Sequence, residues 1–80
     1  MIEFVAKSKI DNLNFHASEC IKTEHGNYWI RFKNNRQRDD FIIKLFLRAI
    51  FYNNDQNLLT VSNNLVIIKS PEIEIDEVKL

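Results

Sequence analysis

The side chains with metal-binding character are gathered in residues 16–25, which contain His16, Cys20, Glu24 and His25. The alternation of apolar residues here predicts a strand, in which His16 and Cys20 would lie about 13 Å apart at ~3.3 Å per residue. That separation is too large for both side chains to bind one ion directly, and the spacing matches no common paired-ligand motif. We therefore expect no metal site.

Nucleophilic catalysis needs a base beside the nucleophile and donors for a developing oxyanion, usually on a tight glycine-containing loop. Gly26 is the single glycine of the chain, and no phosphate-binding or dinucleotide-binding glycine motif is present. The acidic run at residues 72–77 is more typical of a solvated strand edge than of paired catalytic acids or a calcium site. The sequence predicts that the chain is not an enzyme and has no cofactor.

One aromatic residue stands among cations. In a strand, Trp29, Arg31 and Lys33 share a face, and the predicted hairpin places Lys22 across from Trp29. Such a surface is typical of sheets that stack on single-stranded bases while contacting phosphates. It is also an ordinary outer sheet surface, in which cationic side chains cover the tryptophan with their stems. Single-stranded nucleic-acid binding is thus an alternative function, and the zero net charge argues against it.

Residues 41–52 are unusually apolar, with ten apolar residues in twelve. If they are helical, packing one face on a sheet needs an arc of only about 100°. The residues that fill this arc are Ile42, Leu45, Phe46, Ala49 and Ile50. The apolar residues left on one flank, Ile43, Leu47 and Phe51, are bordered by the cations Lys44 and Arg48.

Proteins seldom leave such an apolar patch in water, so the helix flank predicts a protein interface, with Phe51 as its main anchor. The alternative is that a curved sheet or the acidic C-terminal segment covers the flank.

Three Asn-Asn pairs, at residues 34–35, 53–54 and 63–64, mark the element boundaries, because asparagine tolerates positive φ. Before the first pair, alternating apolar residues predict strands near residues 2–6, 13–21 and 28–32. The turn around Gly26 would place Ile21 opposite Ile30 and Cys20 opposite Arg31.

A helix is predicted from Asn35 to Asn53, with Asn34 or Asn35 as its N-cap. A hairpin with an Asn63-Asn64 turn follows, and Leu59, Val61, Val66 and Ile68 share one of its faces. Residues 71–80 are expected to form an acidic edge strand or a loosely ordered tail. Residues 1–80 are thus expected to be a single small α+β domain: an antiparallel sheet of four to five strands packed on one helix, in the order β-β-β-α-β-β.

The charges limit the kinds of partner. Lys and Arg (11) balance Asp and Glu (11), but residues 1–50 carry nine cations and six anions, and residues 51–80 carry two and five, giving +3 and −3. Any electrostatic attraction would therefore be local. The lone Cys20, the absence of a signal-peptide pattern and an apolar window too short to cross a bilayer predict a cytoplasmic protein.

Together these features predict a non-enzymatic protein-binding module, such as a regulator, inhibitor or adaptor. Its partner would be another protein or a second copy, whose acidic residues 72–77 would complement the helix cations. Richness in Ile, Asn, Lys and Phe is what an AT-rich genome encodes and is compatible with a phage or mobile-element origin.

Overall fold

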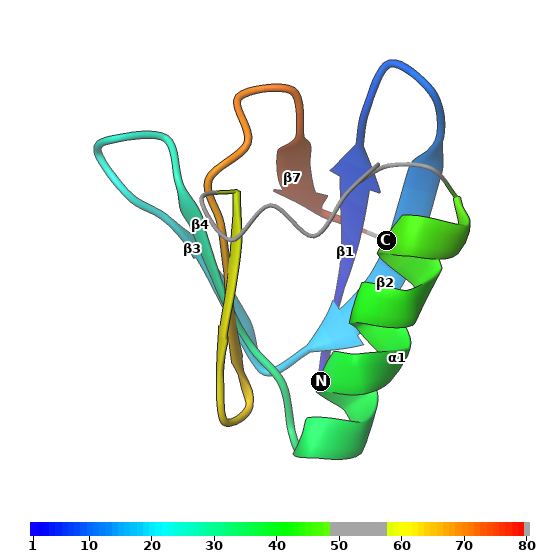
Figure 1. Ribbon diagram of the computed structural model, residues 1–80, viewed down its shortest axis with the longest axis vertical. Helices are drawn as coiled ribbons and strands as arrows, with labels where there is room; N and C mark the ends of the chain where they lie inside the picture. Colours follow the sequence, from blue (N-terminus) through cyan, green and yellow to red (C-terminus); the bar gives the residue numbers. More distant parts are fainter. Residues whose placement is uncertain (49–57, 80) are drawn as a thin grey trace.

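The computed structural model describes residues 1–48 and 58–79, which form seven strands and one helix (Figure 1). The elements are β1 (Ile2–Lys7), β2 (Asn12–Ala17), β3 (Glu19–Lys22), β4 (Tyr28–Arg31), α1 (Asn35–Leu47), β5 (Leu59–Ser62), β6 (Leu65–Ile68) and β7 (Glu74–Glu77). Within the described ranges, no helix is long and apolar enough to cross a membrane.

The strands form two antiparallel sheets, with the orders β2-β1-β7 and β3-β4-β6-β5. The four-stranded sheet lies on the left in Figure 1, and α1 lies on the right beside β2. The predicted α+β class is confirmed, whereas the single sheet of four to five strands and the order β-β-β-α-β-β are wrong.

The difference arises at Ser18, where the strand predicted over residues 13–21 breaks into β2 and β3. Leu13, Phe15 and Ala17 point inward at odd positions, but in β3 the residue turned towards the core is Cys20, at an even position. The Ser18 N–H donates to the Arg31 carbonyl oxygen at 2.8 Å, which attaches the chain to β4 from this point. This change of phase lets β2 pair with β1 and β3 pair with β4.

The first hairpin also differs from the prediction, by one residue in register. Cys20 lies opposite Ile30, and Ile21 lies opposite Trp29. The backbones of Thr23 and Asn27 are hydrogen bonded at 2.8 Å, which leaves three residues in the turn, and Gly26 takes a φ of 83°. Because a slip of one residue exchanges the two faces of a strand, Ile21 points outward with Trp29.

The second hairpin forms as predicted, with Leu59 opposite Ile68 and Val61 opposite Val66. Asn63 in its turn takes a φ of 53°, in the left-handed region that asparagine tolerates. The acidic C-terminal segment contains β7, an edge strand that pairs with β1.

The core lies between the two sheets and the helix, and aromatic rings connect these layers. The centre of the Phe41 ring lies 4.5 Å from the centre of the Phe15 ring and 5.1 Å from the centre of the Phe32 ring. The buried apolar residues are Phe4, Ala6, Leu13, Phe15, Ala17, Tyr28, Ile30, Phe32, Phe41, Leu45, Val66, Ile68, Ile73 and Ile75.

The helix begins as predicted but is rotated relative to its predicted core face. The Asn34 Oδ1 caps it by accepting from the Gln37 backbone N–H at 2.9 Å. Phe41 and Leu45 are its buried residues, whereas Ile42 and Phe46 are half-buried. The predicted core face, which did not include Phe41, is therefore wrong in part. The described helix ends at Leu47, and the predicted end near Asn53 lies outside the described residues. The predicted core residues Ala49 and Ile50 lie outside the described residues.

Candidate functional site

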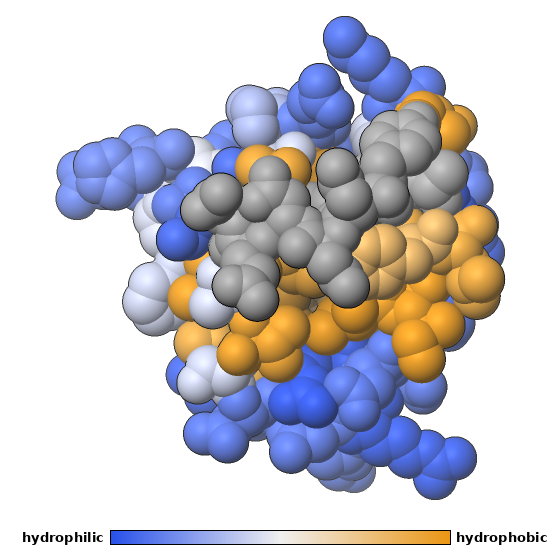
Figure 2. Space-filling model, viewed as in Figure 1, coloured by the Kyte–Doolittle hydropathy of each residue, from blue (hydrophilic) through white to orange (hydrophobic). Residues whose placement is uncertain are grey.

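The described part of the helix flank consists of Ile43 and Leu47, which are 54% and 79% exposed. Side chains four residues apart are neighbours on a helix, so these two form a continuous apolar surface. Figure 2, in the view of Figure 1, shows apolar residues in a band that runs from the α1 side of this face towards β5. The third predicted anchor, Phe51, lies outside the described residues.

The two cations predicted to border the flank differ in their surroundings. Lys44 is exposed. The Arg48 guanidinium lies 3.5 Å from an Asp11 carboxylate oxygen and donates to the Asn12 carbonyl oxygen at 3.4 Å. Arg48 thus extends towards the turn between β1 and β2, where its charge is already paired.

The residues of the nucleic-acid alternative lie on two faces of the four-stranded sheet. Trp29 and Arg31 point outward, and Trp29 is 45% exposed. Lys22 pairs with the inward-facing Tyr28, and its Nζ lies 5.6 Å from the centre of the Tyr28 ring. Lys33 is exposed and follows the end of β4. The predicted position of Lys22 opposite Trp29 is therefore wrong, because the hairpin register is shifted.

The actual neighbours of Trp29 across the sheet are Ile21 on β3 and Ile67 on β6. Ile67 was not predicted as a neighbour of Trp29, although the sequence contains a signal for it. The four residues of β6, Leu-Val-Ile-Ile, are all apolar. Because successive side chains of a strand point to opposite faces, such a run makes both faces of the sheet apolar.

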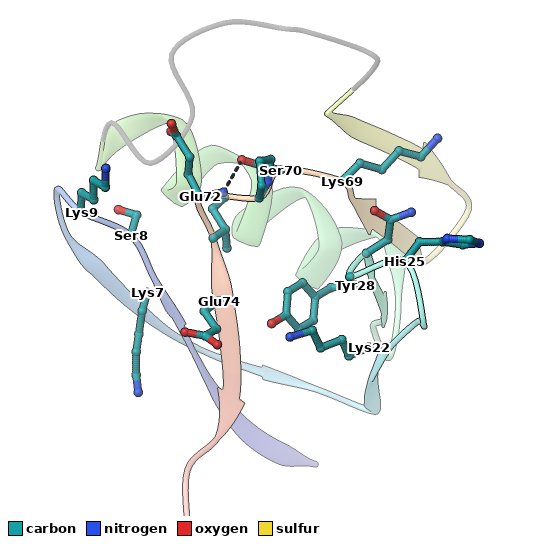
Figure 3. Close-up of a pocket in the computed structure, with 14 residues that line it drawn as sticks. Lys7, Ser8, Lys9, Lys22, His25, Tyr28, Lys69, Ser70, Glu72 and Glu74 are labelled. Atoms are coloured by element: carbon teal, nitrogen blue, oxygen red, sulfur yellow. Dashed lines mark hydrogen bonds between the residues drawn. The ribbon is translucent and has the colours of Figure 1, made fainter.

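A cleft of about 530 Å³ opens between the ends of the two sheets (Figure 3). The Lys22 ammonium and the Tyr28 hydroxyl point into it, towards the side from which Glu74 projects. Its lining carries charges of both signs, from Lys7, Lys9, Lys22, Lys69, Glu72 and Glu74.

Two lining residues have the types used in catalysis but lie apart. The Ser70 hydroxyl accepts a hydrogen bond from the Glu72 backbone N–H at 3.3 Å, and His25 points away from it (Figure 3). The Lys7 ammonium lies 3.0 Å from an Asp76 carboxylate oxygen, which raises the pKa of Lys7. The described lining thus offers mixed charge rather than a nucleophile beside a base.

The cluster at residues 16–25 is dispersed in the fold. Across residues 1–48 and 58–79, no three His, Cys, Asp or Glu side chains lie close enough to hold a metal ion. Cys20 is half-buried, and burial raises the pKa of its thiol to about 11. The thiol therefore stays protonated at neutral pH, a form that is a poor nucleophile and a poor metal ligand.

Comparison with known proteins gives no match, so the helix flank, the four-stranded sheet and the cleft are the features from which function can be inferred. No protein-family model matches the chain, and neither a curated protein nor a solved structure shows significant similarity to it.

Proposed function

We propose that this chain is a non-enzymatic protein-binding module, a small regulator, inhibitor or adaptor, that contacts its partner through the helix flank. The observation that supports this proposal is the exposure of Leu47, which at 79% is the highest among the large apolar side chains of the described residues. Ile43, one helical turn earlier, is 54% exposed. Large apolar side chains that meet a partner commonly carry most of the binding energy of an interface.

The energy available from this surface is considerable for a small domain. Full burial of a Leu or Ile side chain is worth about 1.5 to 3 kcal/mol relative to exposure. A chain of 80 residues needs most of its apolar residues for its own core. Two adjacent apolar side chains left in water therefore favour a surface that becomes covered on binding.

The charges near the flank favour a foreign protein over a second copy at this site. Arg48 is paired with Asp11, and Asp76 of the acidic C-terminal strand is paired with Lys7. Arg48 and Asp76, two of the charges that would join the flank to that strand of a second copy, thus have partners within one chain. Lys44 and Asp40 remain exposed beside the flank, so a partner with an apolar groove and a mixed polar rim fits best.

The same proposal includes a cytoplasmic location. Cys20 is the single cysteine of the chain, so an internal disulfide is impossible. Proteins of oxidising compartments, especially small ones, usually rely on disulfides for stability. A small domain held together by its core alone fits a reducing compartment.

The proposal is tested by capturing partners of the tagged chain in its own host and comparing the wild type with Leu47→Glu and Ile21→Glu. Ile21 is an exposed apolar residue on the four-stranded sheet and serves as the matched control. Leu47→Glu should lose a partner protein that the wild type and Ile21→Glu both retain. Because Leu47 is exposed, its substitution should change the free energy of unfolding by no more than about 0.5 kcal/mol.

Two results would contradict the proposal. One is the same set of captured proteins for all three chains. The other is unfolding of the Leu47→Glu variant, which would place the flank within the core.

A further inference from the structure

The outer face of the four-stranded sheet carries a continuous apolar row, formed by Ile21, Trp29 and Ile67. These residues lie directly opposite one another on the adjacent strands β3, β4 and β6. Their neighbours along the strands, Ile30 and Val66, are fully buried, so the row must project to the other side. Ile21 is 53% exposed, Trp29 is 45% exposed and Ile67 is half-buried.

The next rung of the sheet, meaning the residues paired across its strands two positions further along, adds a pair of opposite charges. Glu19 on β3 lies opposite Arg31 on β4, which lies opposite Leu65 on β6. The Arg31 Nε lies 3.3 Å from the Glu19 Oε1, and both side chains are about half exposed (49% each). On this side the row is therefore bordered by one cation and one anion, beside a further apolar residue.

We infer that this row is a self-association surface, through which two copies of the chain pack sheet against sheet about a two-fold axis. A two-fold contact requires a surface that complements itself, so that residue i meets residue j and j meets i. The row meets this requirement when the axis runs between β3 and β4, because Ile21 of each copy then meets Trp29 of the other while Arg31 of each copy meets Glu19 of the other. The chain has no net charge to oppose the approach of an identical copy.

A second copy fits this face better than a nucleic acid does. Binding to single-stranded nucleic acid combines base stacking with a positively charged groove. Here the cation Arg31 stands beside the anion Glu19, so this face is not a positively charged groove, and Lys22 lies on the opposite face of the sheet with Tyr28. Isoleucine rather than lysine borders Trp29 on both sides.

The packing geometry sets the expected strength of the dimer. Two sheets stack face to face about 10 Å apart, with their strands within about 30° of each other. The strands here are only four residues long, so the contact is at the small end of protein interfaces. We therefore expect a dimer that forms at micromolar rather than nanomolar concentration. Ile30 and Val66 on the opposite face of these strands are buried in the core, on the side where Figure 1 shows α1, so the row faces away from the helix and dimer formation leaves the helix flank open.

The first test measures the mass and the tryptophan emission of the whole chain over a range of concentrations. The mass should rise with concentration towards twice the 9.5 kDa of one chain. Trp29 is the single tryptophan, so its emission should shift to shorter wavelength as the dimer buries it. Ile21→Glu should remain monomeric, whereas Ile43→Glu, on the helix with nearly the same exposure (54% against 53%), should dimerise like the wild type.

The second test exchanges charges and keeps the apolar row intact. The Glu19→Arg variant carries two cations on the rung and the Arg31→Glu variant carries two anions, so each alone should dimerise about tenfold more weakly than the wild type, because like charges then face each other across the interface. An equimolar mixture should regain the dimer, because the two rungs then attract each other across the interface. Circular dichroism and thermal unfolding of each variant establish that the fold is retained.

A wild-type mass of one chain at every concentration, with an unchanged emission maximum, would overturn the inference. A dimer that persists in Ile21→Glu, or a mixture that stays monomeric, would also overturn it. So would an emission shift seen only on addition of single-stranded oligonucleotides, which would assign the row to nucleic acid. None of these results bears on the helix flank, which Leu47→Glu tests separately.

Discussion

Substitution of Phe41 by alanine tests which face of α1 belongs to the core. The Phe41 side chain is 3% exposed, and its ring contacts Phe15 and Phe32. Truncation of a fully buried Phe to Ala typically costs about 3 to 5 kcal/mol. A domain of this length has a free energy of unfolding of about 4 to 12 kcal/mol, so the loss is at least about a quarter of the total.

Phe46→Ala is the matched control, since it makes the same substitution on the same helix at a half-buried position. Its cost should be roughly half as large, because less apolar surface leaves water when the domain folds. Urea unfolding followed by circular dichroism measures both losses. Equal losses, or a loss below about 1 kcal/mol for Phe41→Ala, would refute the orientation of the helix.

Two further predictions concern local features. Asn34→Ala should destabilise the domain by about 1 kcal/mol, because Asn34 caps α1, whereas Asn35→Ala should be nearly neutral; equal urea midpoints would show that the cap contributes nothing. The pKa of the Cys20 thiol is raised by burial from its ordinary 9.0 to about 11, so alkylation of the folded chain should reach half its maximal rate near pH 11. Since the Cys20 thiol loses its proton at a lower pH in the unfolded chain, the free energy of unfolding should fall as the pH rises from 9 to 11. An alkylation midpoint at or below pH 9 would contradict both predictions.

The features that could be predicted from the sequence depend on short stretches of chain. The Asn34 cap, the start of α1 and the β5–β6 hairpin each follow from neighbouring residues. The pairing of β7 with β1 joins Phe4 to Glu77, and nothing local in either strand specifies the other. The core face of α1 could not be predicted either, because apolar residues occur around most of the helix and the apolar pattern therefore has only a weak helical period.

The surfaces were predictable to different degrees for the same reason. Ile43 and Leu47 could be placed on an exposed flank because residues four positions apart stay on the same side of a helix even when the helix is rotated modestly about its axis. The apolar row of Ile21, Trp29 and Ile67 was not predicted, because the two faces of a strand alternate with a period of two residues. An error of one residue in the turn at Gly26 therefore placed Ile21 in the core and Lys22 beside Trp29.

The most direct measurement of the proposed function is photo-cross-linking in the host cell from a benzoyl-phenylalanine placed at position 47. The control carries the same group at Glu24, an exposed position in the turn between β3 and β4. The proposal predicts a discrete cross-linked product with a second protein from position 47 and none from position 24. No product from position 47, or the same products from both positions, would contradict a role for the helix flank in binding.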